Sequence, residues 1–114
     1  MLPFYRAPFI FCHFIGTGYD VNELIHESGH AFVFYTASHF QRLYEYHRST
    51  PSVNEIHSQA MVLLAFPYME RFFGGQKDLF IRKHLYDTLR VLPYRCIVDE
   101  FEHKVYENIS LTKT

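Results

Sequence analysis

The pattern of apolar and polar positions predicts a mainly α-helical chain with one short strand near its start. Residues 8–14, PFIFCHF, are rich in aromatic and β-branched residues, begin with proline and end before a Gly-Thr-Gly sequence, as is typical of an edge strand. Asp20, with Glu23 three positions later, resembles a capping box. A helix is therefore expected over about residues 21–46, a stretch without proline.

Three further helices are expected downstream. Thr50 as N-cap, with Pro51 at the first helical position, predicts a helix over about residues 51–66. The sequence FFGG at residues 72–75 interrupts the helical pattern, and helices follow over about 76–92 and 93–108, the second beginning at Pro93. No repeat or linker divides the chain, so residues 1–114 are expected to form a single domain.

Composition and charge narrow the choice of partner. Apolar residues make up 48% of the chain and aromatic residues 18%, which is ample for a buried core. The 11 basic and 12 acidic residues are scattered, with a net charge of −1, so neither nucleic acid nor an anionic membrane is an expected partner. No run reaches the roughly 18 apolar residues that cross a bilayer. A soluble intracellular protein that binds a small molecule or a peptide is expected.

The stretch LIHESGHAF at residues 24–32 carries the candidate chemistry. On a helix, residues four apart lie on one face, so His26 and His30 can direct ring nitrogens to one point, with Glu27 turned about 100° away. Two imidazoles and one carboxylate bind zinc with an open position, where the pKa of a water falls to roughly 7. An HExxH match alone is only moderately specific, because a helix can carry two histidines by chance. A third ligand is needed.

Glu55 is the candidate third ligand, 29 positions after His26 on the next expected helix. A short turn between antiparallel helices can bring it level with the two histidines. The alternative is a carboxylate that merely complements the helix dipole. His13, on the expected strand, is a candidate substrate contact. Gly29 costs the helix about 1 kcal/mol relative to alanine, which is understandable if another backbone, such as the strand, passes close by; simple tolerance is the alternative.

Three segments in this order, APFIFCHFIGTGYDVNELIHESGHAF, NEIHSQAM and FFGG, resemble the oligoendopeptidase F family of zinc peptidases, which is related to thimet oligopeptidase. The resemblance implies the central, helical zinc-peptidase core segment of that family. It implies that His26, His30 and Glu55 bind one zinc ion and that Glu27 is catalytic. It also implies oligopeptide substrates, a cytoplasmic location, and an edge strand beside the cleft where an extended peptide could pair.

Family members are several times longer, and their later segment carries a histidine and tyrosines that contact the substrate. This chain has no counterpart of that segment, so the oxyanion-stabilising group is unassigned, and His103 and Tyr106 are expected to be surface or packing residues. Two functions stay open. One is a zinc-dependent endopeptidase segment that hydrolyses oligopeptides by metal-activated water; the other is a catalytically incomplete, zinc-stabilised helical domain that acts as a binding or structural module. Apolar surface left uncovered predicts self-association.

Overall fold

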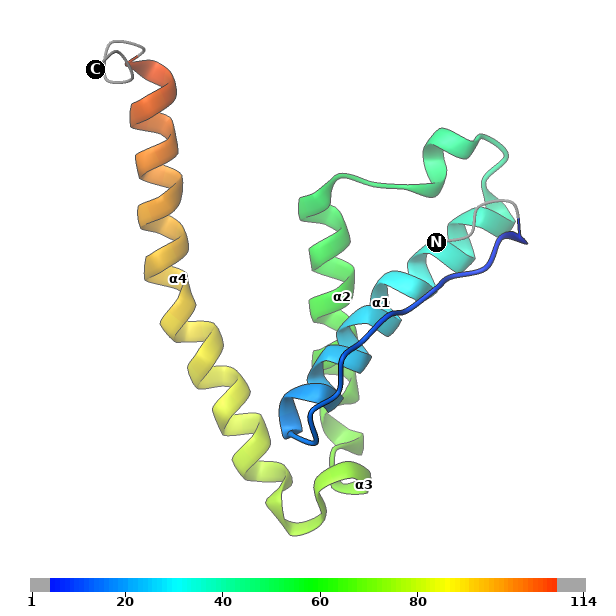
Figure 1. Ribbon diagram of the computed structural model, residues 1–114, viewed down its shortest axis with the longest axis vertical. Helices are drawn as coiled ribbons and strands as arrows, with labels where there is room; N and C mark the ends of the chain where they lie inside the picture. Colours follow the sequence, from blue (N-terminus) through cyan, green and yellow to red (C-terminus); the bar gives the residue numbers. More distant parts are fainter. Residues whose placement is uncertain (1–4, 109–114) are drawn as a thin grey trace. The chain divides into compact units, whose positions relative to one another are not determined.

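The computed structural model describes residues 5–108 and shows a mainly helical chain (Figure 1), which confirms the helical fold class. Short 3₁₀ turns join the α-helices at Tyr44–His47, Phe66–Tyr68 and Gly74–Gln76. The α-helices are α1 (Gly18–Phe40), α2 (Pro51–Ala65), α3 (Glu70–Phe73) and α4 (Lys77–Glu107).

The chain divides into two compact units, Met1–Lys77 and Asp78–Thr114, and the single domain over residues 1–114 stays a prediction. The first unit is built on the packing of α1 against α2, which contact each other more extensively than any other pair of helices in the described chain. In the described residues the second unit is formed by α4 from Asp78 onward, and none of its side chains is buried. All the candidate site residues lie in the first unit.

The expected edge strand over residues 8–14 does not form. Between residues 5 and 108 there is no sheet, and a strand needs a partner to take up its N–H and C=O groups. The segment is extended and runs alongside α1 instead (Figure 1). Pro8, Phe9 and Ile10 line the same cavity as residues of α1. The aromatic, β-branched pattern therefore produced an extended segment without a sheet.

α1 begins at Gly18, three residues earlier than predicted, because Thr17 and not Asp20 is the N-cap. The Asp20 carboxylate accepts hydrogen bonds from the backbone N–H groups of Ile15, Gly16 and Thr17 at 3.1, 2.6 and 2.8 Å. Gly16 has φ +82°, a left-handed conformation that favours glycine. One carboxylate thus closes the turn that carries the chain from the extended segment into α1.

α1 ends at Phe40, six residues before the predicted end near residue 46. Gln41 takes an extended conformation, and the 3₁₀ turn Tyr44–His47 follows. His47 Nε2 donates a hydrogen bond to the Gln41 carbonyl at 3.0 Å, and its ring lies against Phe34, with centroids 6.4 Å apart. This hydrogen bond and the aromatic contact fold the chain back onto α1. Helix propensity, which is read along one segment, does not reveal such contacts between segments.

α2 follows the predicted boundaries to within a residue. The Thr50 side chain accepts the Val53 N–H at 3.4 Å, and Pro51 occupies the first turn. The residues buried between α1, α2 and the following turn are few, and several are small or polar: Phe34, Ser38, Ser58, Val62 and Met69. Small side chains at this contact let the two helices approach closely, which matters for the site described below.

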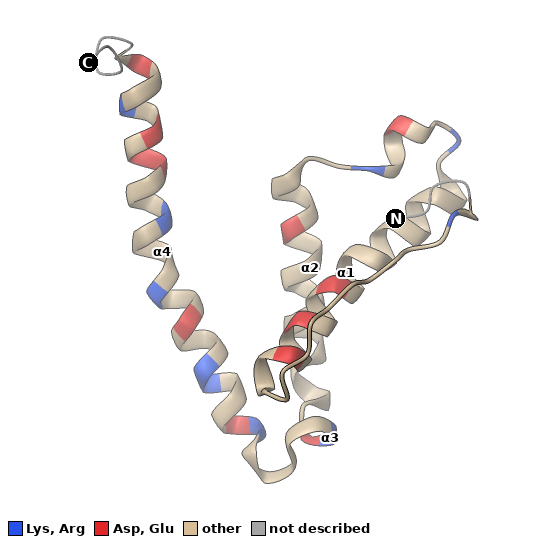
Figure 2. Cartoon of the chain, in the orientation of Figure 1, with Lys and Arg blue, Asp and Glu red and all other residues tan. Residues whose placement is uncertain are grey.

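α4 runs through Pro93 as one helix, where the sequence predicted two helices, 76–92 and 93–108. Proline removes one i to i−4 hydrogen bond, but its φ near −65° is compatible with a helix, so good helix formers on both sides can continue it. Lys83 and Asp87 pair at 2.6 Å, as do Lys104 and Glu100 at 2.5 Å, one turn apart on its surface. Basic and acidic residues are both distributed along α4 (Figure 2).

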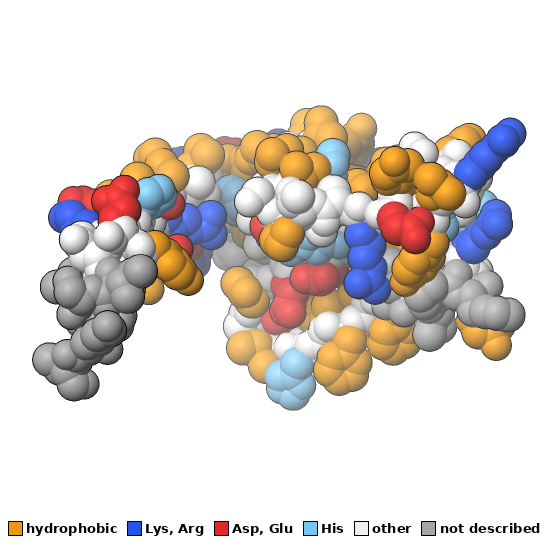
Figure 3. Space-filling view, turned by 90° about the horizontal axis from the view of Figure 1, so that it is seen from above, with side chains coloured by type: hydrophobic (Ala, Val, Ile, Leu, Met, Phe, Trp, Pro, Cys, Tyr) orange, Lys and Arg blue, Asp and Glu red, His pale blue; other side chains and the backbone are white. Residues whose placement is uncertain are grey.

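Large apolar side chains remain exposed on the first unit, and the space-filling view shows apolar groups spread over one face (Figure 3). Phe32 on α1 is 60% exposed, and Leu64 near the end of α2 is 69% exposed. Apolar surface of this kind is what the expectation of self-association rests on. Within the described range, no helix has both the length and the apolar character needed to cross a membrane.

Candidate metal centre

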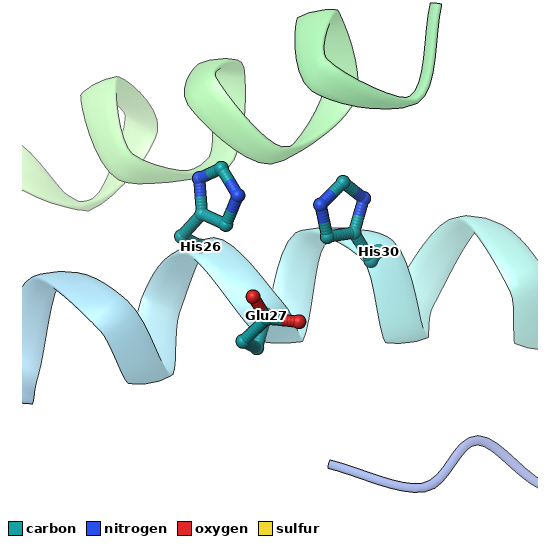
Figure 4. A group of neighbouring side chains, drawn as sticks. All are labelled: His26, Glu27 and His30. Atoms are coloured by element: carbon teal, nitrogen blue, oxygen red, sulfur yellow. The ribbon is translucent and has the colours of Figure 1, made fainter. Parts of the chain in front are cut away.

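His26 and His30 lie on successive turns of α1 and extend toward α2, with Glu27 between them (Figure 4). The two imidazole rings are edge to face, with centroids 4.9 Å apart and planes at 86°. Their side chains are 19% and 28% exposed, so they are mostly withdrawn from water without being sealed. The four-residue spacing therefore produces the shared face that the sequence predicted.

These three side chains form a group that could hold a metal ion. One ligand atom from each of His26, Glu27 and His30 lies within 4.8 Å of the others. α1 carries carboxylates but no lysine or arginine (Figure 2), so nearby charge on this helix favours a cation. Imidazole and carboxylate ligands suit several divalent first-row metals, among which geometry and availability decide.

Glu55 reaches both histidines from α2. Its Oε2 lies 3.4 Å from His26 Nε2, and its Oε1 lies 3.5 Å from His30 Nε2. These distances exceed the roughly 2.7–2.9 Å of a charge-assisted hydrogen bond. They are close to the edge of a tetrahedron whose centre lies about 2.0–2.1 Å from each ligand atom, which is about 3.3–3.4 Å. Each separation is the one that a tetrahedral site requires between one nitrogen and one oxygen, but the two run to different oxygens of Glu55. The three side chains whose ligand atoms all lie within 4.8 Å of one another remain His26, Glu27 and His30.

Ser58, which the sequence analysis did not single out, holds the Glu55 carboxylate. Its hydroxyl lies 3.2 Å from Glu55 Oε2 and 3.1 Å from the Glu55 carbonyl, and donates its one proton to this pair. Ser58 is fully buried, while the Glu55 side chain is 58% exposed. A buried donor three residues along the helix therefore orients a carboxylate that is otherwise free to turn into solvent. The sequence signal was a serine one turn beyond the candidate ligand.

Gly29 allows this arrangement because α2 passes directly over it. A Cβ placed on Gly29 would lie 2.8 Å from Ser58 Cα, 3.0 Å from Met61 Cβ and 3.2 Å from the His57 carbonyl oxygen. The close neighbour is therefore α2, not the expected strand. The glycine between the two histidines brings the helix that carries Glu55 into ligand range.

A cavity of about 480 Å³ opens beside the group. Glu27, His30 and Glu55 lie at one part of its wall. The rest of the wall comes from the extended segment, α1, the turn before α2 and the first turn of α2, and consists of Pro8, Phe9, Ile10, Ala31, Val33, Phe34, His47, Arg48, Pro51 and Asn54. Glu27, His30 and Glu55, but not His26, thus face a space large enough for part of a peptide.

Other candidate residues do not line this cavity. His13 is exposed and does not line the cavity, so the structure provides no contact for the predicted substrate role. His57 is exposed on α2, and His103 and Tyr106 are exposed on α4. The pKa of Cys12 is raised by partial burial and then by Glu23 and Glu27, which keeps the thiol protonated and a poor metal ligand at neutral pH.

Comparisons with models of protein families, with curated proteins and with solved structures find no match to this chain. The similarity to oligoendopeptidase F therefore stays a prediction that rests on the residues quoted from the sequence.

Proposed function

We propose that this chain is a zinc-dependent endopeptidase segment that hydrolyses oligopeptides. One observation carries the proposal: Glu55 on α2 lies 3.4 and 3.5 Å from the Nε2 atoms of His26 and His30. Glu27 stands between these histidines, beside a cavity that it also lines. Two imidazoles with one carboxylate and room for a fourth ligand make up a common catalytic zinc set.

Each side chain then has a separate task. His26, His30 and Glu55 would hold the ion, and zinc, when bound, supplies a Lewis acid that polarises the scissile carbonyl and acidifies water. Glu27 accepts a proton from the attacking water and returns it to the nitrogen of the departing amine. Ser58 keeps the Glu55 carboxylate turned toward the histidines through its hydrogen bond.

The test combines a fluorogenic peptide assay with metal analysis. Wild-type chain should bind close to one equivalent of zinc and cleave the peptide, and a chelator should abolish cleavage. Glu27→Gln should keep the metal and lose activity by about 100-fold or more, because it removes the proton acceptor. His103→Ala, on α4, is the matched histidine control and should change neither. Full hydrolysis by Glu27→Gln, or zinc retained in full by His30→Ala, contradicts the proposal.

The second candidate is a zinc-stabilised helical module without catalysis. The observation in its favour is that the candidate ligands lie on two helices, so one ion bound by them would cross-link α1 and α2 in a unit with few buried apolar residues. Under this function, zinc raises the thermal midpoint of the chain, while peptide cleavage stays at the level of the chelated sample. The two functions are separated by turnover, since both predict zinc binding.

A further inference from the structure

The cavity beside the candidate metal centre has a second end with a different chemistry. His30, Glu27 and Glu55 line it at the metal end, whereas His47 and Arg48 line it from the turn before α2. The rest of the wall is mostly apolar and includes Phe9, Ile10, Ala31 and Phe34, with Asn54 as its polar member. A positively charged side chain beside an apolar wall is a common arrangement for binding a ligand with one apolar part and one acidic part.

The distance between the two ends follows from α1. Phe34 lies one turn after His30, an axial rise of about 6 Å. The His47 ring packs on Phe34 with centroids 6.4 Å apart, so the turn that carries His47 and Arg48 lies about one helical turn beyond the candidate ligand. An extended peptide advances about 3.3 Å per residue. A bound peptide with one of its peptide bonds at His30 would therefore reach His47 and Arg48 about two residues further along its chain.

The turn that presents Arg48 is held in place. His47 Nε2 donates to the Gln41 carbonyl at 3.0 Å, and the His47 ring also contacts Tyr44, with centroids 5.5 Å apart. Arg48 is exposed and also interacts with another part of the chain. A guanidinium has five N–H donors in a planar fork, so it can serve one partner and still bind a carboxylate.

Resting on the proposed peptidase function, we infer that the cavity is a peptide subsite for an apolar side chain followed, within about two residues, by a carboxylate that Arg48 binds. Either the C-terminal carboxylate of the peptide or an aspartate or glutamate side chain supplies this group. The acidic residues of the cavity, Glu27 and Glu55, lie at the metal end, where bound zinc would offset their charge. Peptides that carry an acidic group at this position form the preferred substrate class.

Binding to the zinc-loaded Glu27→Gln chain tests the subsite without turnover. Three fluorophore-labelled peptides share one apolar residue and differ at their last residue, two positions later. The first ends there in a free C-terminal carboxylate, the second in Gln with a C-terminal amide, and the third in Glu with a C-terminal amide. Fluorescence anisotropy gives Kd for each. We expect at least one carboxylate peptide to bind about 10-fold tighter than the Gln amide. This gain is at the low end of those for charge-assisted hydrogen bonds, because Arg48 is exposed and solvent weakens the interaction. The peptide that gains identifies the source of the carboxylate.

Substitutions separate Arg48 from the metal, which also attracts carboxylates. Adding Arg48→Gln to the Glu27→Gln chain should remove the preference, and adding Arg48→Lys should retain part of it. Arg42→Gln, an exposed arginine outside the cavity, changes the net charge equally and should leave the preference intact. Equal binding of all three peptides, or a preference that survives Arg48→Gln, overturns the subsite. Hydrolysis by the wild type is measured separately, so failure of the peptidase proposal is distinguished from failure of the subsite.

Discussion

Replacing Gly29 by alanine tests the link between helix packing and the metal centre. The new Cβ would lie 2.8 Å from Ser58 Cα, and ordinary van der Waals contact begins at 3.4 Å, so α2 must shift by about 0.6 Å. Overpacking of this kind costs about 1–3 kcal/mol, and alanine returns about 1 kcal/mol of helix propensity. The net loss of stability is about 0–2 kcal/mol, small enough for the variant to fold.

The effect on metal binding should be larger than the effect on folding. Ser58 is one turn from Glu55, so a shift of α2 lengthens the 3.4 and 3.5 Å separations between Glu55 and the histidines beyond the edge of a tetrahedral site. We expect zinc affinity to fall about 10- to 100-fold, as when groups that position ligands are altered. Competition with a chromophoric chelator measures the affinity, and thermal unfolding followed by circular dichroism measures stability.

Gly75→Ala provides the matched control, since apart from its chain neighbours no atom of the described residues lies within 4 Å of the position that its Cβ would take. It should leave zinc affinity unchanged. Wild-type zinc affinity in Gly29→Ala would mean that the close approach of α2 does not set the position of Glu55.

Three further predictions follow from other parts of the chain. Ser58→Ala should lower zinc affinity about 10-fold in the chelator competition, and Ser58→Thr, which keeps the hydroxyl, should recover part of it; equal affinity in both variants would exclude a positioning role for the hydroxyl. Pro93→Ala restores a backbone hydrogen bond inside α4 and should raise the helical circular dichroism signal and its thermal midpoint, since interior proline costs about 3 kcal/mol relative to alanine; an unchanged melt would contradict the continuous helix. The pKa values of Asp87 and Glu100 are lowered, each chiefly by a hydrogen bond from a lysine one turn away. These two carboxylates therefore stabilise α4 above their ordinary pKa values of 3.8 and 4.5, and the stabilisation is lost as the pH falls below those values. The helical circular dichroism signal should decline over that pH range, and it should decline less in the Asp87→Asn, Glu100→Gln double variant.

The sequence predicted the parts of the site that depend on one helix. The four-residue spacing of His26 and His30 placed both rings on one face of α1, and Thr50 with Pro51 located the start of α2. These features are local, because periodicity and capping involve residues within a turn or two of each other. Whether Glu55 comes level with the histidines and faces them depends on the rotation of α2 about its axis. Counting residues along the sequence does not determine this rotation.

Features that depend on contacts between elements were missed or misplaced. For Gly29 the sequence left two alternatives, a backbone such as the expected strand passing close by or simple tolerance, because it does not tell which backbone crosses a helix at a glycine. Ser58 was overlooked, because a buried serine and an exposed one look alike in sequence. The aromatic segment at residues 8–14 has strand composition, but a strand also requires a partner, and the described chain has none for it.

The most direct test of the proposed zinc site is the zinc content of the purified chain and of two carboxylate variants after equilibration with one equivalent of the metal. We expect close to one zinc per chain in the wild type and in Glu27→Gln, and a clear loss in Glu55→Ala, since the proposed ligands are His26, His30 and Glu55. Zinc retained in Glu55→Ala but lost in Glu27→Gln would contradict it and would assign the metal to the carboxylate of α1.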